Sequence, residues 1–180
     1  MDNYALMTEE QKELVGLAKQ ILTRELTPRI KELEEGGDYP VDVQKKLCDA
    51  GLYALNIPQQ YGGYGMSAVT NTIFYEEMAR VEGGFAFSFG NTGSNYDIIA
   101  MLGTEEQKKY VAKRLLEDNA IMPFALTEPE AGSDAANIRT TAVREGDEYV
   151  INGAKCFITN GGLADMVIVA ATMDRSLGHR

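Results

Sequence analysis

Residues 122–134 read MPFALTEPEAGSD, and they lie where the hydrophobic pattern of the chain changes. Before about residue 120, apolar residues recur with the spacing of about 3.6 residues that is typical of amphipathic helices. Beyond that point they alternate with polar residues, as in half-buried strands. The apolar run from Met122 to Leu126 predicts a strand, which ends before Pro129 because proline has no N–H to donate to a sheet. The pattern indicates an α+β fold with a helical domain over residues 1–119 and an antiparallel β domain over residues 120–180.

A polar loop follows this strand. Gly132 allows a ligand to approach the backbone closely, and Ser133 and Asp134 add a hydroxyl and a carboxylate. Successive N–H groups in such a loop can bind an anion such as a phosphate. The same residue types are common in ordinary turns, so composition alone favours a simple connection between two strands.

Local signals predict the helices of the first domain. Thr8 and Thr104 each begin a capping box, Ser67 is an N-cap, and Pro40 occupies a first helical position. The expected helices cover residues 9–27 or beyond with a kink at Pro28, then 40–50, 67–81, 85–102 and 104–115. The fourth of these is expected to be largely buried. Apolar spacing predicts that the first and last helices bury Leu14, Leu17, Ala18, Ile21, Leu22, Tyr110, Val111 and Leu115.

The second domain is expected to contain a meander of short strands. Alternating patterns predict strands over residues 121–126, 139–143, 148–151, 155–159 and 166–172. Residues 145–147 form the first predicted turn, and Asn152-Gly153 is a strong signal for a two-residue hairpin. Such a sheet has more edge than a finished domain leaves exposed, so the β domain is expected to be incomplete.

Composition excludes several classes of partner. The chain has 180 residues and a formal net charge of −10, which repels nucleic acid and anionic lipid surfaces. No apolar run approaches the roughly 20 residues of a membrane span, and the acidic N-terminus is unlike a targeting peptide. We therefore expect a cytoplasmic protein that binds neither nucleic acid nor membranes.

Histidine and cysteine are scarce. His179 is the one histidine, and Cys48 and Cys156 lie far apart without the spacing of a metal site, so both are expected to be reduced and structural. This scarcity excludes most Ser-His-Asp, Cys-His and histidine-metal sites. No metal site is expected, and a catalytic base would have to be a carboxylate, a lysine or a tyrosine.

Five motifs in order resemble those of the acyl-CoA dehydrogenase family of flavoproteins. They are PQQYGGYG at 58–65, YEEMAR at 75–80, LGTEEQK at 102–108, LTEPEAGSDAANIRT at 126–140 and EGDEYVINGAKCFITNGG at 145–162. Five ordered motifs are far more specific than one. The resemblance extends over essentially the whole chain.

The resemblance implies an activity. Family members use FAD to remove hydrogen from Cα and Cβ of an acyl-CoA thioester. A glutamate takes the α proton, the β hydrogen moves as hydride to the flavin, and a trans-2-enoyl-CoA results. Electrons then pass to an electron-transferring flavoprotein, and the complete enzymes are tetramers or dimers. The weakly acidic α proton requires stabilisation of the enolate oxygen and a desolvated base.

The resemblance also assigns roles to residues. Leu126 and Thr127 are implied to hydrogen-bond the pyrimidine end of the flavin, Phe157 to pack on its ring, and Thr159 to reach N5. Ser133 is implied to touch both cofactor and substrate. The implied cofactor-binding residues are Phe124, Ala125, Leu126, Thr127, Gly132, Ser133, Phe157, Ile158 and Thr159.

Substrate contacts are implied in the first domain. The central helix lines the acyl pocket in the family, which implies that Thr92, Gly93 and Ser94 face the substrate. Packing of these small residues against another helix is an equal alternative. Two positions depart from common family patterns: Glu130 stands where many members have glycine, and Phe157 where many have tryptophan.

The resemblance covers only the first half of the family's length or slightly less. The chain is therefore expected to be a fragment without the second helical domain, which supplies the catalytic glutamate. None of Glu76, Glu77, Glu128 and Glu130 matches that position, so no catalytic residue is assigned and the isolated chain is expected to be inactive. Two alternatives stay open: an enoyl-CoA reductase that runs the same chemistry in reverse, and a non-catalytic binding or assembly module.

Overall fold

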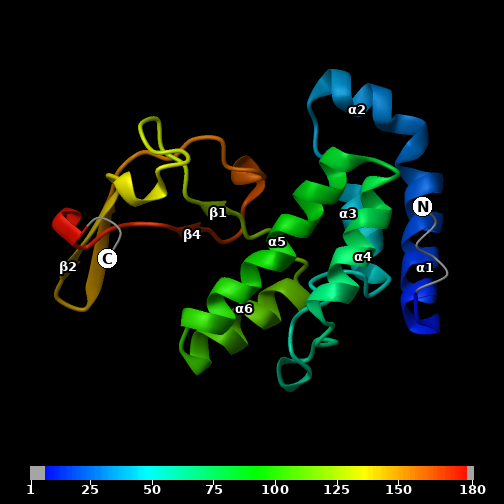
Figure 1. The fold of residues 1–180 in the computed structure, drawn as a ribbon, viewed down its shortest axis with the longest axis horizontal. Helices are drawn as coiled ribbons and strands as arrows, with labels where there is room; N and C mark the ends of the chain where they lie inside the picture. Colours follow the sequence, from blue (N-terminus) through cyan, green and yellow to red (C-terminus); the bar gives the residue numbers. More distant parts are fainter. Residues whose placement is uncertain (1–6, 178–180) are drawn as a thin grey trace. The chain divides into compact units, whose positions relative to one another are not determined.

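The computed structural model describes residues 7–177, and the chain divides into two compact units, Met1–Ala120 and Ile121–Arg180. The first unit is helical, and the second contains short strands and long irregular segments (Figure 1). The predicted α+β fold class is confirmed. Each unit is described below by itself.

The first unit is a bundle of packed helices. Helix α4 packs against α1 and α5, α3 packs against α1, and α6 packs against α5. Single 3₁₀ turns at Thr27–Arg29 and Gln59–Tyr61 complete the unit. The α-helices are α1 Glu9–Glu25, α2 Ile30–Gly36, α3 Val41–Asp49, α4 Ala68–Ala79, α5 Gly83–Leu102 and α6 Glu105–Glu117.

Caps confirm the helix starts predicted at Thr8, Ser67 and Thr104, whereas Pro40 is the N-cap of α3 rather than its first residue. Thr8 and Thr104 form complete capping boxes with Gln11 and Gln107. The Ser67 hydroxyl accepts a hydrogen bond from the backbone N–H of Thr70. Each cap satisfies N–H groups that have no partner within the helix, which fixes where the helix begins.

The first turn of α5 is capped by a residue that the sequence analysis did not identify. The Glu82 carboxylate accepts hydrogen bonds from the backbone N–H groups of Gly84 and Phe85. A carboxylate in this position also interacts favourably with the positive end of the helix dipole. Glu82 therefore begins α5 two residues before the predicted start.

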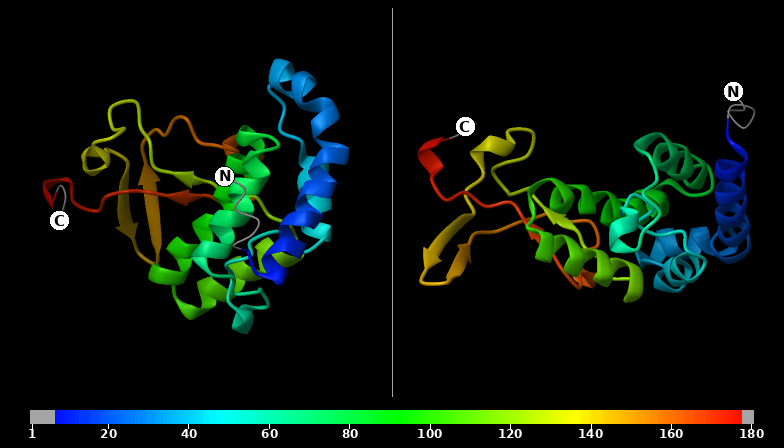
Figure 2. Two further views of the ribbon diagram at one scale, coloured as in Figure 1. Left: turned by 45° about the vertical axis from the view of Figure 1, so that its right-hand side comes forward. Right: turned by 90° about the horizontal axis from the view of Figure 1, so that it is seen from below.

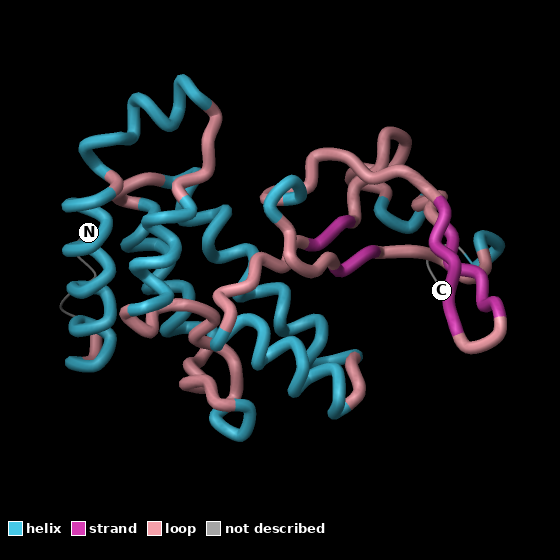
Figure 3. The backbone as a smooth tube through the Cα atoms, turned by 180° about the vertical axis from the view of Figure 1, so that it is seen from behind, coloured by secondary structure: helices cyan, strands magenta, loops and turns pink. Residues whose placement is uncertain are grey.

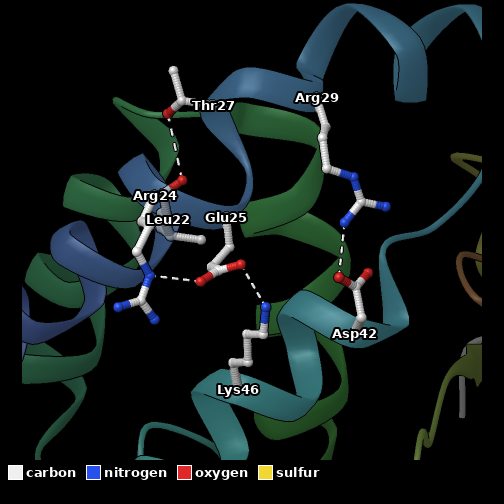
Figure 4. Close-up of polar contacts among 7 residues, drawn as sticks. All are labelled: Leu22, Arg24, Glu25, Thr27, Arg29, Asp42 and Lys46. Atoms are coloured by element: carbon white, nitrogen blue, oxygen red, sulfur yellow. Dashed lines mark hydrogen bonds and ion pairs between the residues drawn. The ribbon is translucent and has the colours of Figure 1, made fainter.

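Ion pairs to α3 fix the end of α1 (Figure 4). The predicted kink at Pro28 is a complete break between two helices. Glu25 pairs with Lys46 of α3 at 2.5 Å, and Arg29 pairs with Asp42 at 2.7 Å. Pro28 lies in the 3₁₀ turn between these two pairs, so α1 and α2 are separate helices.

Two predicted buried positions are exposed. Leu17 is 41% exposed and Tyr110 is 54% exposed. In α1 the buried face is instead formed by Val15, Ala18, Ile21 and Leu22. The correct stripe is rotated by about one residue because Val15, rather than Leu14, points to the centre of the packed face.

Helix α5 is buried on one side, which corrects the expectation that it is largely buried. Phe85, Phe89 and Tyr96 are almost inaccessible, whereas Phe87, Met101 and Leu102 are 65%, 81% and 80% exposed. Within its own unit, α5 is covered by α4 and α6. Its remaining apolar side chains are left uncovered there.

The second unit contains two separate strand pairs, drawn in magenta in Figure 3. Strand β1, Phe124–Ala125, pairs in parallel with β4, Ile168–Val169. Strand β2, Thr141–Glu145, pairs antiparallel with β3, Glu148–Asn152, as a hairpin that Figure 2 shows as two adjacent arrows. The predicted meander is wrong, because β1 pairs with the most distant strand of the unit and in the parallel direction.

The predicted turn at 145–147 is confirmed, but the predicted hairpin at Asn152-Gly153 is wrong. Gly146 has a φ of 65° and closes the β2–β3 turn. Residues 153–158 belong to no strand. A Cβ on Gly153 would lie 2.2 Å from the Thr140 hydroxyl oxygen. Glycine is therefore required at residue 153 because its backbone lies against Thr140, and not because it forms a turn.

Within residues 7–177, no helix combines the length and the apolar character that crossing a bilayer requires.

Candidate functional site

The candidate cofactor site lies in the second unit, where two segments run side by side. The Lys155 ammonium group donates to the Leu126 carbonyl oxygen at 2.9 Å and to the Glu128 carboxylate at 2.8 Å. The Cys156 backbone N–H donates to the Thr127 carbonyl oxygen at 3.0 Å. Residues 126–128 and 155–156, far apart in the sequence, are thereby joined.

Glu128 is the centre of this arrangement. Its side chain is 4% exposed, and it accepts hydrogen bonds from the backbone N–H groups of Arg139 at 2.6 Å and Thr140 at 2.9 Å. The Thr140 hydroxyl also donates to it at 2.5 Å. A buried carboxylate needs such partners, because an unpaired charge is very costly to remove from water. Glu128 therefore joins three segments of the chain.

The role of this pair was missed in the sequence. The sequence analysis assigns Glu128 no role beyond a carboxylate that does not match the family's base, and it assigns no role to Lys155. A signal was present, because Lys155 is the one basic residue in the run 145–162. A single lysine among apolar and small residues often indicates a buried partner.

The environment of Glu128 sets its ionisation. Burial by itself would raise the pKa of this carboxyl, but the hydrogen bonds from Lys155, Thr140 and Arg139 together lower the pKa to about 2. Glu128 is consequently charged at neutral pH. A charged carboxylate that is already held by a lysine is not available as a proton acceptor.

Acid is expected to destabilise the second unit through Glu128. Because the folded pKa is about 2 and the ordinary value is 4.5, the stabilisation is complete above about 4.5 and is lost as the pH falls toward 2. The urea midpoint of unfolding should therefore fall over this range. Glu128→Gln should lower the midpoint at neutral pH and flatten the slope between these two pH values. An equally steep slope in the variant would contradict the assignment.

The predicted cofactor residues of the first segment lie on and after β1. Phe124 and Thr127 are half-buried, whereas Ala125 is 4% exposed within the strand. A tight turn follows, in which the backbone N–H groups of Glu128 and Ala131 bond each other's carbonyl oxygens at 3.0 and 3.2 Å. Gly132 and Ser133 follow the turn and are exposed.

The second predicted segment presents an aromatic ring. Phe157 is 92% exposed, and its φ of 56° lies in the left-handed region that residues other than glycine rarely adopt. Ile158 and Thr159 beside it are half-buried. An exposed ring on a strained backbone is a common feature of ligand-binding segments.

The first segment also offers hydrogen-bond donors that fit a cofactor with polar edges and phosphates. Among residues 7–177, no acceptor takes up the backbone N–H groups of Thr127, Gly132 or Ser133. Two of these residues, Gly132 and Ser133, are exposed. The residues present therefore suit FAD, which combines a flat ring with a pyrimidine edge and a pyrophosphate.

The predicted substrate residues lie on α5 in the first unit, and the structure separates their environments. Thr92 is 2% exposed. A Cβ on Gly93 would lie 3.3 Å from the Cα of Ala54 and 3.2 Å from the Tyr75 hydroxyl, so Gly93 serves close packing. Ser94 is exposed. Of the three, Ser94 is placed to contact a ligand.

Ser94 lines a groove between α4 and α5. Its apolar part has a volume of about 580 Å³ and is lined by residues that include Ala79, Ala86, Phe87 and Gly90. The Tyr75 ring lies against Gly90, where a Cβ would be 2.9 Å from a ring carbon. Burial raises the pKa of Tyr75 above its usual range, so the phenol stays protonated.

A polar cavity adjoins this groove, and Tyr75 and Ser94 line both. The Asn56 amide donates to the Asp97 carboxylate at 2.7 Å and to the Gly93 carbonyl oxygen at 3.2 Å. The groove is thus apolar along most of its length and polar at one end.

Ion pairs also engage the other carboxylates that were candidates for a base. Glu77 is buried and pairs with Lys19 and Arg80, Arg80 also pairs with Glu76, and Glu130 pairs with Arg139. Both cysteines are free. In the part of the chain that the structure describes, no group of three or more His, Cys, Asp or Glu side chains is arranged to hold a metal ion.

Two family models match the chain. The acyl-CoA dehydrogenase N-terminal domain matches residues 8–119, and the acyl-CoA dehydrogenase middle domain matches residues 123–180. Among curated proteins, a cyclohex-1-ene-1-carbonyl-CoA dehydrogenase of Syntrophus aciditrophicus is 39% identical and is matched over 97% of this chain and 42% of its own length. A 3-(aryl)acrylate reductase of Clostridium sporogenes is 36% identical over 95% of this chain and 46% of its own.

Solved structures are similar over the same range. Butyryl-CoA dehydrogenase from Megasphaera elsdenii matches with a TM-score of 0.87 and 34% identity, over 96% of this chain and 46% of that chain. A glutaryl-CoA dehydrogenase from Mycobacterium smegmatis in complex with FADH2 matches with a TM-score of 0.86 and 32% identity, over 96% and 45%. A structure described as the electron-transferring flavoprotein of Acidaminococcus fermentans matches with a TM-score of 0.89 and 35% identity, over 96% and 46%.

The chain thus spans less than half the length of the relatives it matches. The ranges of the two family models follow the division of the chain into a helical unit and a strand-containing unit. The chain belongs to the acyl-CoA dehydrogenase family, of which it contains the N-terminal domain and the matched part of the middle domain.

Proposed function

We propose that this chain is part of an FAD-dependent enzyme that dehydrogenates an acyl-CoA thioester between Cα and Cβ to give a trans-2-enoyl-CoA. One observation carries the proposal. Residues 126–128 and 155–156 are joined so that free backbone N–H groups lie on one segment and the exposed ring of Phe157 follows the other. This arrangement suits a flat, polar-edged cofactor, and the family to which the chain belongs supports FAD.

Within this proposal, each segment has a part in binding. When bound, FAD supplies the acceptor for the hydride that leaves Cβ. Leu126 and Thr127 bind the pyrimidine end of the ring, Phe157 packs on its face, and Thr159 contacts its central edge. The segment from Phe124 to Ser133 also excludes water from one side, and Ser133 contacts both the cofactor and the CoA part of the substrate.

The base that removes the α proton is proposed to lie outside this chain. Glu76 and Glu77 pair with Arg80, Glu128 pairs with Lys155, and Glu130 pairs with Arg139. Each of these carboxylates is therefore engaged by a cationic partner, and the lowered pKa of Glu128 makes it a weak base. We propose that another part of the complete protein supplies the base.

The acyl group is proposed to occupy the groove beside Ser94. Ser94→Leu should place a branched side chain in the groove and raise KM for longer acyl-CoAs about tenfold, because overpacking costs about 1–3 kcal/mol. Short acyl-CoAs should be affected less. Steady-state kinetics with a series of chain lengths would measure this effect. Val69→Leu is the control, since Val69 lies on α4, is 65% exposed and is not among the residues that line the groove.

The electron acceptor is proposed to be an electron-transferring flavoprotein, and the complete enzyme is proposed to be a homo-oligomer. Phe87, Met101 and Leu102 leave α5 with apolar surface that its own unit does not cover. Exposed apolar side chains of this size are candidates for protein contacts. We also propose that the family's N-terminal domain ends at residue 119 and that the middle domain begins at residue 120.

The proposal is tested by mixing the purified flavoprotein, expressed as its gene encodes it, with a panel of saturated acyl-CoAs without oxygen. Bleaching of the oxidised flavin absorbance by a member of the panel is the expected result, and that member identifies the substrate class. A protein that carries no flavin, or a flavin that no acyl-CoA ester reduces or reoxidises, would contradict it.

The second candidate function is reduction of an enoyl-CoA in the same site. The similarity to the 3-(aryl)acrylate reductase of Clostridium sporogenes favours this alternative. A flavin that stays oxidised with every saturated ester, but is reoxidised by an enoyl-CoA after chemical reduction, would identify a reductase.

A further inference from the structure

We propose that the buried Glu128–Lys155 ion pair is a positioning pair for the cofactor, which holds the two flavin-contact segments together. The inference rests on the proposed function, because it requires that FAD binds to these segments. It gives a role to Glu128 and Lys155, neither of which is among the predicted cofactor-binding residues. Neither residue is proposed to touch the reacting atoms.

The ion pair connects the two segments directly. Lys155 bonds the Leu126 carbonyl oxygen at 2.9 Å and the Glu128 carboxylate at 2.8 Å, so it bonds the other segment rather than its own. The Cys156 N–H likewise donates to the first segment, to the Thr127 carbonyl oxygen at 3.0 Å. The predicted flavin residues lie directly beside these contacts, with Leu126 and Thr127 on one segment and Phe157 on the other. A shift in the ion pair would therefore shift both sets of contacts.

The second argument is the backbone at Phe157. Its φ of 56° is unfavourable for a residue with a side chain, so it must be maintained by its surroundings. Lys155 and Cys156, the two preceding residues, are both bonded to the first segment. These bonds anchor the chain directly before the strained residue and thereby direct the exposed ring.

The third argument is that Glu128 is itself firmly placed. It accepts hydrogen bonds from Arg139 and from both the N–H and the hydroxyl of Thr140. Thr140 packs so closely on Gly153 that any side chain at residue 153 would clash. The carboxylate is thus fixed from the β2 side, and the lysine is fixed by the carboxylate. Ligand sites require such supporting contacts to hold binding groups in place.

A purely stabilising role would make a different prediction. Replacing both members of a buried ion pair by apolar residues is often neutral or stabilising. Such a replacement should restore the part of the stability that a single substitution loses through the unpaired charge. It would not restore the hydrogen bond that Lys155 donates to the Leu126 carbonyl oxygen or those that Thr140 donates to Glu128. Stability and cofactor affinity can therefore be separated.

The test compares FAD affinity and thermal stability of the protein as its gene encodes it, in its FAD-free form. Lys155→Met should raise the FAD dissociation constant by about ten- to a hundredfold, the usual effect of losing a supporting contact behind a bound group. It should also alter the visible absorption band of the flavin at saturating FAD. Arg144→Met is the control, since Arg144 is an exposed cation of the same unit and should leave both unchanged.

The double variant Glu128→Leu with Lys155→Met decides between the two roles. We expect it to recover much of the thermal stability lost by Lys155→Met while FAD binding stays weak and the absorption band stays altered. Recovery of FAD affinity together with stability, or unaltered FAD binding by Lys155→Met, would overturn the inference. If the unsubstituted protein binds no FAD, the proposed function itself is contradicted and the inference falls with it.

Discussion

Glu128→Ala is expected to lower the free energy of unfolding of the second unit by about 3–5 kcal/mol, the usual cost of removing one partner of a buried ion pair. The loss arises because Lys155, whose side chain is 11% exposed, would keep a buried charge without its carboxylate. The backbone N–H of Thr140 would also lose its acceptor.

Hydrogen exchange in urea would measure this effect on amides of the β2–β3 hairpin, which belongs to the same unit. Glu148→Ala is the matched control, because Glu148 lies in β3 and is exposed. Surface substitutions of this kind usually change stability by less than about 0.5 kcal/mol. A loss from Glu128→Ala as small as that of the control would show that the ion pair is not structural.

Phe89→Ala is expected to lower the free energy of unfolding of the helical unit by about 3–5 kcal/mol, as is usual for a buried phenylalanine. Phe89 is 1% exposed. Its ring centroid lies 5.7 Å from that of Phe85 and 5.2 Å from that of Tyr53. The substitution removes these ring contacts and leaves a cavity against which neighbouring side chains can relax only in part.

Urea unfolding followed by circular dichroism would measure this loss, since the first unit contains all of the long helices. Phe87→Ala is the control on the same helix, because Phe87 is two residues away and 65% exposed. Equal losses from the two substitutions would contradict the description of α5 as a helix with one buried face.

Local features of the helical unit were predictable from the sequence. Thr8 and Thr104 begin helices because the capping box is a contact between residues three positions apart. Gly146 closes a turn for an equally local reason. The sequence does not determine which face of each helix is buried. Leu17 and Tyr110 fit an apolar stripe, but neighbouring helices determine which side of the stripe is covered.

Features of the second unit that depend on distant residues were not predictable in this way. Strand β1 pairs with β4, which lies more than 40 residues later, and no local pattern indicates that partner or its parallel direction. The Asn152-Gly153 signal was misleading because Gly153 is required by contact with Thr140. The Glu128–Lys155 pair likewise joins residues from different segments.

The resemblance to a family carried the assignment of the candidate site further than residue chemistry alone. Gly132 and Ser133 are compatible with any exposed turn. Burial decides that Ser94, and not Thr92 or Gly93, can contact a ligand, and the sequence does not show which of the three is buried. What the structure adds is the joining of two distant segments beside Phe157.

The central claim is that FAD binds against residues 124–133 and 155–159. Hydrogen–deuterium exchange of the protein as its gene encodes it, with and without FAD, tests this claim most directly. We expect slower exchange in both segments when FAD is added, and unchanged exchange in α1. Unchanged exchange in both segments while FAD binds, or no binding of FAD, would contradict the account.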